Sequence, residues 1–181
     1  MNRRALLALA AALPFAGAAR AETAAAGRLV LHEAMASAHA KTRNVSVWLP
    51  PGYDASDARH PVLYMHDGQN LFDASTANFG EWGVDEHLTR LIAGDQVRAP
   101  IVVGVWNTDL RLREYLPSDL IAALPAEMRD EVQAIYGGPP LSDGYLRFLT
   151  DELKPFVDGT YRTLTGPEDT MISGSSMGGL I

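Results

Sequence analysis

Alternation of apolar and polar residues marks the first strands of the chain. Between Asn44 and Leu49 every second residue is a branched aliphatic side chain, which is the period of a strand with one buried face. Residues 29–33 form a second candidate, and we expect the two to begin a sheet as an antiparallel pair. Unbroken apolar runs at residues 61–65 and 99–105 instead predict strands that are buried on both faces.

Two later segments show the helical period. Residues 81–93 place apolar side chains three or four positions apart, and Gly94 is suited to end that helix. Ser142 is suited to cap a second helix, in which Pro155 is expected to kink or fray the end. The apolar stripe of this second helix consists of Leu146, Leu149, Leu153, Phe156 and Val157. We interpret both stripes as core-packing faces.

The alternating order of strands and helices predicts an α/β fold with a mostly parallel sheet flanked by helices. In such a sheet the functional loops follow the carboxyl ends of the strands, which places Asp67, Trp106 and Ser176 at one edge. Residues 119–141 contain several prolines and glycines, and we expect them to form an insertion that covers the pocket at this edge.

A β-rich run, residues 169–173, leads into a Gly-x-Ser-x-Gly pattern at residues 174–178. In this turn, the nucleophile elbow, the serine hydroxyl stands clear of the sheet, and glycines are needed where a Cβ would clash. Ser176 is therefore the candidate nucleophile, and the backbone N–H of Met177 is a candidate oxyanion donor. Ser173 and Ser175 lack glycine two positions away on both sides. The alternative is a Gly/Ser loop that only turns the chain.

The first 21 residues have the pattern of a secretory signal peptide, with two early arginines, a short apolar core and a small-x-small site at residues 19–21. The core is about a dozen residues, short of the roughly 20 that span a bilayer, so we expect no membrane anchor after cleavage. The chain has no cysteine, which excludes disulfides, a thiol nucleophile and thiolate metal ligands.

The net charge of the chain indicates which classes of partner it is not expected to bind. The chain carries 15 Lys and Arg against 22 Asp and Glu, and three of the basic residues (Arg3, Arg4 and Arg20) lie in the predicted signal. A mature chain that begins at residue 22 would therefore have 12 basic and 22 acidic residues, a formal charge of −10. Such an acidic chain is not expected to bind nucleic acid or an anionic membrane.

The position of the elbow bears on how much of the domain is present. In enzymes with this turn the catalytic acid and histidine follow the serine in chain order, but only five residues follow Ser176. We therefore expect residues 22–181 to be the amino-terminal part of a single domain, truncated after the elbow. The acid, the histidine and the later strands and helices would be absent, and this fragment alone would be inactive.

Three more segments precede the elbow in order: Tyr64-Met65-His66-Asp67-Gly68-Gln69-Asn70-Leu71-Phe72, Glu81-Trp82-Gly83-Val84-Asp85 and Arg113-Glu114-Tyr115-Leu116-Pro117. With them, residues 40–181 resemble the putative-esterase family of α/β-hydrolases, which includes enterochelin esterases, S-formylglutathione hydrolases and feruloyl esterases. The resemblance implies the α/β-hydrolase fold. It also implies that the backbone N–H of Gln69 is the second oxyanion donor.

Several polar residues in these segments have two interpretations each. Asp67 precedes the serine, so we expect it to brace the oxyanion loop rather than to be the catalytic acid. We expect His66 to be a locally hydrogen-bonded strand-end residue rather than the general base, because the family's histidine lies downstream. Arg113 and Glu114 either line the substrate pocket or form a salt bridge that fixes their loop. The other histidines show no ligand spacing, so neither a metal site nor a cofactor is expected.

In function, the resemblance implies an exported serine esterase, periplasmic or secreted. It would hydrolyse a small-molecule or carbohydrate ester through an acyl-serine intermediate. Two alternatives stay open. One is an acyltransferase of the same fold that passes the acyl group to a sugar or peptide, and the other is a non-catalytic module that binds carbohydrate or a siderophore.

Overall fold

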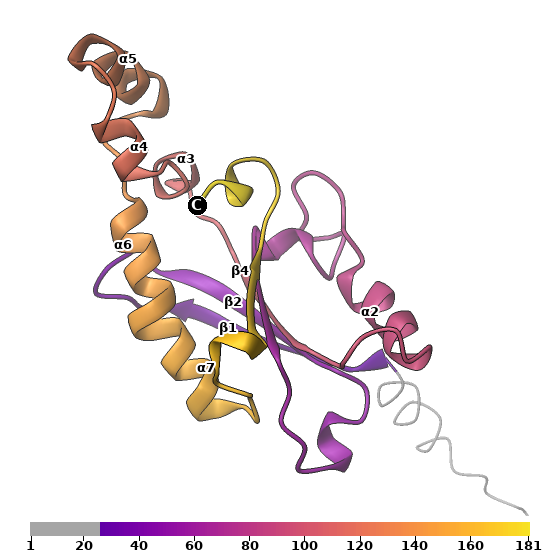
Figure 1. Cartoon of the computed structure of the whole chain (residues 1–181). Coiled ribbons are helices and arrows are strands. Elements are labelled where there is room, and N and C mark those ends of the chain that lie inside the picture. The colour runs from indigo at the N-terminus through magenta and orange to yellow at the C-terminus, as the bar shows by residue number, and fades with distance from the viewer. Residues whose placement is uncertain (1–25) are drawn as a thin grey trace, which may run out of the picture.

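The computed structural model describes residues 26–181, and the predicted signal peptide lies outside them. Its centre is a five-stranded sheet with the strand order β1-β2-β4-β3-β5 (Figure 1). The strands are β1 (Arg28–Met35), β2 (Arg43–Leu49), β3 (Val62–His66), β4 (Ile101–Val105) and β5 (Thr170–Ser173). Each overlaps a strand that the sequence predicts.

The sheet is mixed, and its parallel part contains the strands that the candidate functional loops follow. β1 pairs antiparallel with β2, and β2 pairs antiparallel with β4, whereas β4, β3 and β5 run parallel to one another. In the parallel part His66 lies opposite Val105, and Met65 lies opposite Ser173. The three carboxyl ends therefore lie level, and the loops that follow them share one edge, as the sequence predicts.

Helices cover both faces of the sheet (Figure 1). On one face α2 (Val84–Ala93) packs on a cluster that contains Trp48 and Val102. On the other face α6 (Ser142–Arg147) and α7 (Lys154–Thr160) cover the larger core, whose fully buried members include Val45, Val47, Val103, Val105, Tyr145 and Phe148. β2 is thus buried on both faces, not on one as its alternation predicts, because Trp48 packs in the α2 cluster. The predicted α/β class is confirmed.

A widened turn joins α6 to α7. Residues Phe148–Leu153 form a π-helical segment, and the N–H of Lys154 bonds to the carbonyl of Leu149, five residues back. Since Pro155 has no N–H and its ring crowds the preceding turn, the wider turn lets the chain continue as a helix to Thr160. The predicted distortion at Pro155 is therefore a widened turn before the proline, not a frayed end.

The segment after β4 differs from the expected insertion because it is largely helical. Short helix α3 (Arg111–Glu114) is followed by α4 (Ser118–Ala122) and α5 (Ala126–Tyr136), which project from the body as an arm (Figure 1). Pro125 caps the start of α5, and Gly137, with φ of 81°, caps its end. The prolines and glycines that suggest a loop in the sequence thus bound a helix instead.

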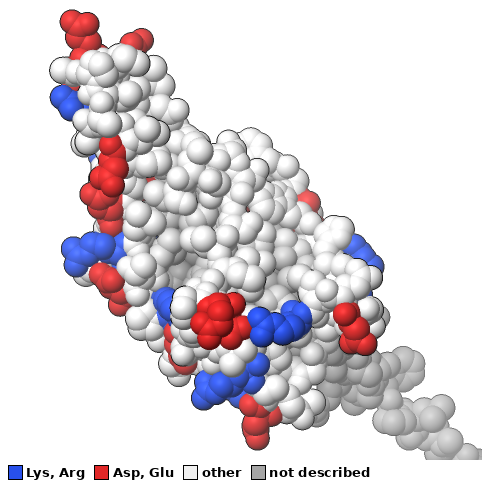
Figure 2. Space-filling view, viewed as in Figure 1, with Lys and Arg blue, Asp and Glu red and all other residues white. Residues whose placement is uncertain are grey.

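Short 3₁₀ turns cover Tyr53–Ala55, Gly68–Asn70, Pro167–Asp169 and Ser176–Gly179. Within residues 26–181, no helix combines the length and the apolar character needed to cross a bilayer. On the face shown in Figure 2, Lys and Arg side chains are scattered and mostly lie beside Asp or Glu, so no continuous basic surface forms there. The expectation that the protein binds neither nucleic acid nor a membrane stays a prediction.

Candidate active site

Ser176 lies in the tight turn that directly follows β5. Ser175 is still extended, with φ of −121° and ψ of 150°, but Ser176 has φ of 55° and begins the 3₁₀ turn Ser176–Gly179. A positive φ is uncommon for a residue with a Cβ and marks a strained position. Ser176 is exposed, so its hydroxyl is accessible from solvent. This is the strand, bend and exposed serine that the elbow motif predicts.

Close backbone approach explains the two glycines of the motif. A Cβ built on Gly174 would overlap the carbonyl of Gly178. A Cβ on Gly178 would lie 3.2 Å from the Cβ of His66, at the end of β3. The turn can therefore fold back on itself and pack against the neighbouring strand only because both side chains are absent.

The loop after β3 forms the opposite side of the site. Asp67 has φ of 58° and ψ of 45°, and the N–H of Asn70 bonds to its carbonyl at 2.9 Å, which closes the turn Gly68–Asn70. Gln69 at the centre of this turn is buried. No hydrogen bond from its backbone N–H or from that of Met177 is found within residues 26–181, but neither residue lines the cleft described below, so their assignment as oxyanion donors stays a prediction.

Asp67 joins this loop to the loop after β4. Its carboxylate accepts hydrogen bonds from Arg111 Nε and Nη2 and from Asn107 Nδ2, each at 2.7 Å. Burial alone would raise the pKa of Asp67, but the bonds from Arg111 and Asn107 outweigh it and hold the pKa below its usual value. Asp67 therefore stays ionised and joins two loops, which fits the bracing interpretation and not that of a catalytic acid bound to a histidine.

His66 is buried behind the elbow rather than in front of it. Its Nδ1 lies 2.6 Å from the hydroxyl of Tyr145, on α6. Burial lowers the pKa of His66 to about 4, although Asp67 acts in the opposite direction, so the ring is neutral near pH 7. His66 is thus hydrogen-bonded at the strand end, as expected, but its partner is distant in sequence rather than local.

A cleft of about 360 Å³ opens in front of Ser176. Its other walls are formed by Asp67, Asn70, Phe79, Trp82, Asn107, Arg111 and Ser175, so Ser175 shares the cleft with Ser176 whereas Ser173 does not. No residue of the α4–α5 arm contributes to the lining, so the expected insertion does not cover this cleft. The cleft combines two aromatic rings with side-chain amides and one ion pair, a surface suited to a small organic molecule that carries oxygen substituents.

Neither Arg113 nor Glu114 lines the cleft. Arg113 donates from Nε to the carbonyl of Pro139 at 2.9 Å, on the exposed side of α3. Glu114 is buried in an ion pair with Arg43 of β2, so the salt-bridge interpretation applies to it. The arginine that does line the cleft is Arg111, two positions earlier on the same short helix. Sequence reasoning missed it because the segment that carries the family resemblance begins at Arg113 and leaves Arg111 out.

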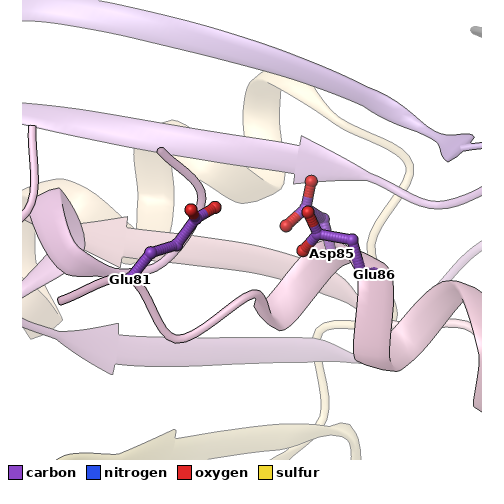
Figure 3. A group of neighbouring side chains, drawn as sticks. All are labelled: Glu81, Asp85 and Glu86. Carbon is purple, nitrogen blue, oxygen red and sulfur yellow. The ribbon is translucent and has the colours of Figure 1, made fainter. Parts of the chain in front are cut away.

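One acidic group lies near the start of α2. The carboxylates of Glu81, Asp85 and Glu86 converge, with oxygens within 4.8 Å of one another (Figure 3). Burial raises the pKa of Asp85 to about 6, and the hydrogen bond with Glu86 acts in the same direction. Below about pH 6 the two carboxyls can therefore share a proton. The expectation that the protein has no metal site stays a prediction.

Comparison with known proteins places this geometry in a family. The chain matches the family described as "Putative esterase" over residues 36–181. It is 25% identical over 142 residues to the uncharacterized protein YbbA of Bacillus subtilis, covering 78% of this chain and 50% of that protein. An IroE-like serine hydrolase from Shewanella oneidensis has a similar structure, with 26% identity and a TM-score of 0.54 over 75% of this chain and 40% of that one.

The siderophore hydrolase EstA from Aspergillus nidulans shares the fold, with 21% identity and a TM-score of 0.55 over 92% of this chain and 53% of that one. The chain spans about half the length of these relatives. The family match covers most of the chain, and the similar structure at 26% identity is a serine hydrolase. The chain therefore belongs to the putative esterase family of the α/β-hydrolase superfamily.

Proposed function

We propose that this protein is a serine esterase whose nucleophile is Ser176. The geometry of Ser176 carries the proposal: an exposed serine with a left-handed backbone at the carboxyl end of β5, on a cleft shared with the loop after β3. Strain at an exposed nucleophilic side chain is a frequent mark of an active site. Membership of an esterase family, with a similar serine hydrolase at 26% identity, supports a carboxylic ester as the substrate.

In the proposed reaction the Oγ of Ser176 attacks the ester carbonyl carbon, and a general base takes the hydroxyl proton. The tetrahedral intermediate expels the alcohol, which leaves with that proton, and an acyl-serine remains. Water, deprotonated by the same base, then attacks the acyl carbon; the bond to the Ser176 Oγ breaks, the acid leaves, and the base returns the proton to Oγ. The N–H groups of Met177 and Gln69 would hold the oxyanion, and each such donor contributes about 3–4 kcal/mol to the transition state.

The proposed general base must be a residue other than those that line the cleft in front of Ser176. No histidine among residues 26–181 lines the cleft, and His66 is bonded to Tyr145 on the other side of the elbow. The proposal therefore requires a histidine, oriented by a carboxylate, from a segment other than those that line this cleft.

We further propose that the enzyme is exported to the periplasm or the medium and that its substrate is a small-molecule or carbohydrate ester. Export is supported by the signal pattern of residues 1–21. The substrate class is supported by the cleft, whose lining includes the aromatic residues Phe79 and Trp82 and the amides of Asn70 and Asn107. A flat ring can stack on the aromatic side chains while its oxygens bind the amides.

Active-site labelling tests the nucleophile. The full-length protein is treated with a fluorophosphonate probe and assayed with p-nitrophenyl acetate, in parallel with Ser176→Ala and Ser173→Ala. Ser173 is the matched control because it is an exposed serine of β5 that lies outside the cleft. We expect only Ser176→Ala to lose labelling and turnover. A wild-type protein that is neither labelled nor active would refute the proposal and favour a binding module.

A further inference from the structure

We propose that Arg111, with the help of Asn107, is a positioning residue for the oxyanion loop, defined here as residues 67–70. The Arg111 guanidinium locks the carboxylate of Asp67, and the locked Asp67 fixes the direction of the Gln69 N–H. The inference rests on the proposed function and extends it to a second loop, the one after β4. It assigns to Arg111 a role that acts through Asp67 rather than through contact with substrate.

Three short, charge-assisted hydrogen bonds hold Asp67. Arg111 donates from Nε to Oδ1 and from Nη2 to Oδ2, and Asn107 donates from Nδ2 to Oδ1, all at 2.7 Å. The Asp67 side chain is only 6% exposed. A two-pronged guanidinium contact fixes the plane of a carboxylate as well as its position, which a lysine ammonium cannot do.

The hydrogen bonds from Arg111 and Asn107 to Asp67, which we call the Asp67 clamp, act at a strained point of the backbone. Asp67 has φ of 58°, a conformation that a residue with a Cβ keeps only where its surroundings enforce it. Its carbonyl accepts the N–H of Asn70, so the conformation of Asp67 sets the turn that carries the Gln69 N–H. Contacts that hold Asp67 therefore also hold the proposed oxyanion donor.

Further contacts tie the two loops into one unit. The backbone N–H of Asn107 donates to the side-chain carbonyl of Gln69 at 3.2 Å, in addition to the bond from its amide to Asp67. The Arg111 guanidinium lies over the ring of Tyr115, 4.9 Å from its centroid, and the N–H of Asp67 reaches the Tyr115 hydroxyl at 3.4 Å. The loop after β4 thus contacts the oxyanion loop at its first and third residues.

Arg111 has a second, electrostatic effect because Asp67 lies on the same cleft as Ser176. An unpaired carboxylate there would repel the negative charge that develops on the substrate oxygen during acyl transfer. The guanidinium cancels that charge. Loss of Arg111 alone should therefore harm catalysis more than loss of the Asp67 charge, and the double substitution should harm it less than the two single effects multiplied.

Kinetics of the full-length protein with p-nitrophenyl acetate test this. We expect Arg111→Met to lower kcat about 100-fold, the loss typical of a misplaced oxyanion donor, with KM changed less than threefold. Arg111→Lys keeps the charge but not the fork and should lower kcat about tenfold. Asp67→Asn should also lose about tenfold, and Asp67→Asn/Arg111→Met should lose less than the product of its parts. Arg147→Met removes an exposed guanidinium paired with Asp151 and should change kcat less than twofold.

Amide hydrogen exchange of the same variants provides a measurement that does not need activity. In Arg111→Lys, peptides covering residues 67–72 should exchange faster, while peptides from β2 and β4 should exchange as in the wild type. A kcat of Arg111→Met within threefold of the wild type, a loss carried by KM, or exchange that is unchanged or faster everywhere would overturn the inference. If the wild type hydrolyses no ester, the proposed function fails, and the exchange result alone decides whether Arg111 holds the loop.

Discussion

Glu114→Ala is expected to destabilise the protein without weakening its affinity for substrate. The Glu114 carboxylate accepts from Arg43 Nη2 at 2.5 Å and from Nη1 at 3.2 Å, and the two side chains are 2% and 0% exposed. The Arg43 guanidinium also lies over the rings of Tyr145 and Phe148, at 5.0 and 5.1 Å from their centroids. Because these rings enclose the Arg43 guanidinium, it cannot reach water when the Glu114 carboxylate is removed.

The size of the effect follows from that burial. Removing one partner of a buried ion pair costs about 3–5 kcal/mol, because the remaining charge is left without compensation. The Thr108 hydroxyl, 3.3 Å from Glu114 Oε2, loses its acceptor as well. At about 2–4 °C per kcal/mol for a domain of 150–250 residues, the Tm should fall by roughly 6–20 °C.

Urea unfolding followed by circular dichroism measures the loss of unfolding free energy, with Asp54→Ala as the matched control. Asp54 also pairs with an arginine, Arg28, but these side chains are 66% and 50% exposed, so its loss should cost less than about 1 kcal/mol. In the full-length protein, the KM of Glu114→Ala for p-nitrophenyl acetate should equal that of the wild type. An unchanged unfolding midpoint together with a raised KM would refute this reasoning and restore Glu114 as a substrate contact.

Three further outcomes are expected. Gln69→Pro removes the proposed oxyanion N–H and should lower kcat about 100-fold, whereas Gln69→Ala keeps that N–H and should retain most activity; equal kcat values would contradict the backbone assignment. Burial lowers the pKa of His66 to about 4, against about 6.5 in the unfolded chain, so the unfolded state binds the proton first. The contribution of His66 to stability should be complete above about pH 6.5 and fall by about 3 kcal/mol as pH drops towards 4. Asp85, whose pKa is raised to about 6, acts in the opposite direction over this range, so the prediction concerns the difference in unfolding free energy between the wild type and His66→Gln; a difference in urea that does not change with pH would contradict it. The 181-residue chain is expected to aggregate through edge strand β5, on which Met171 and Ile172 are 42% and 57% exposed. Ile172→Lys should therefore lower its light scattering, and unchanged scattering would contradict a role of this edge.

The parts of the fold that have a local sequence signal could be predicted. Strand β2 follows from alternation over a few residues, and the elbow follows from Gly174 and Gly178 on either side of Ser176. Each of these signals lies within one element, because it reflects a backbone period or a clash inside one turn. The helical arm shows the limit of such signals, since Pro125 and Gly137 are compatible both with a loop and with the two ends of a helix.

The contacts that complete the site could not be predicted because they join distant parts of the chain. Arg111 contacts Asp67 across 44 residues, and Tyr145 contacts His66 across 79. Which arginine of the pair Arg111 and Arg113 lies on the cleft depends on how α3 is rotated about its axis, since residues two apart on a helix face different directions. That rotation is set by the packing of α3, including the burial of Glu114 against Arg43, which no local pattern contains.

Close contact between strand ends connects the elbow to the oxyanion loop. A Cβ on Gly68 would collide with the backbone of Gly104, in β4, and a Cβ on Gly178 would press on His66, in β3. Glycines therefore set how near the three loops approach, and the level carboxyl ends of β3, β4 and β5 set their height. Because the backbone fixes both the spacing and the height of the loops, the contacts that hold Asp67 act only on the conformation of the turn that carries the Gln69 N–H. The sheet accordingly places Ser176 and the loops after β3 and β4 on one edge, and in our proposal the long-range ion pair at Asp67 sets the orientation of the Gln69 N–H.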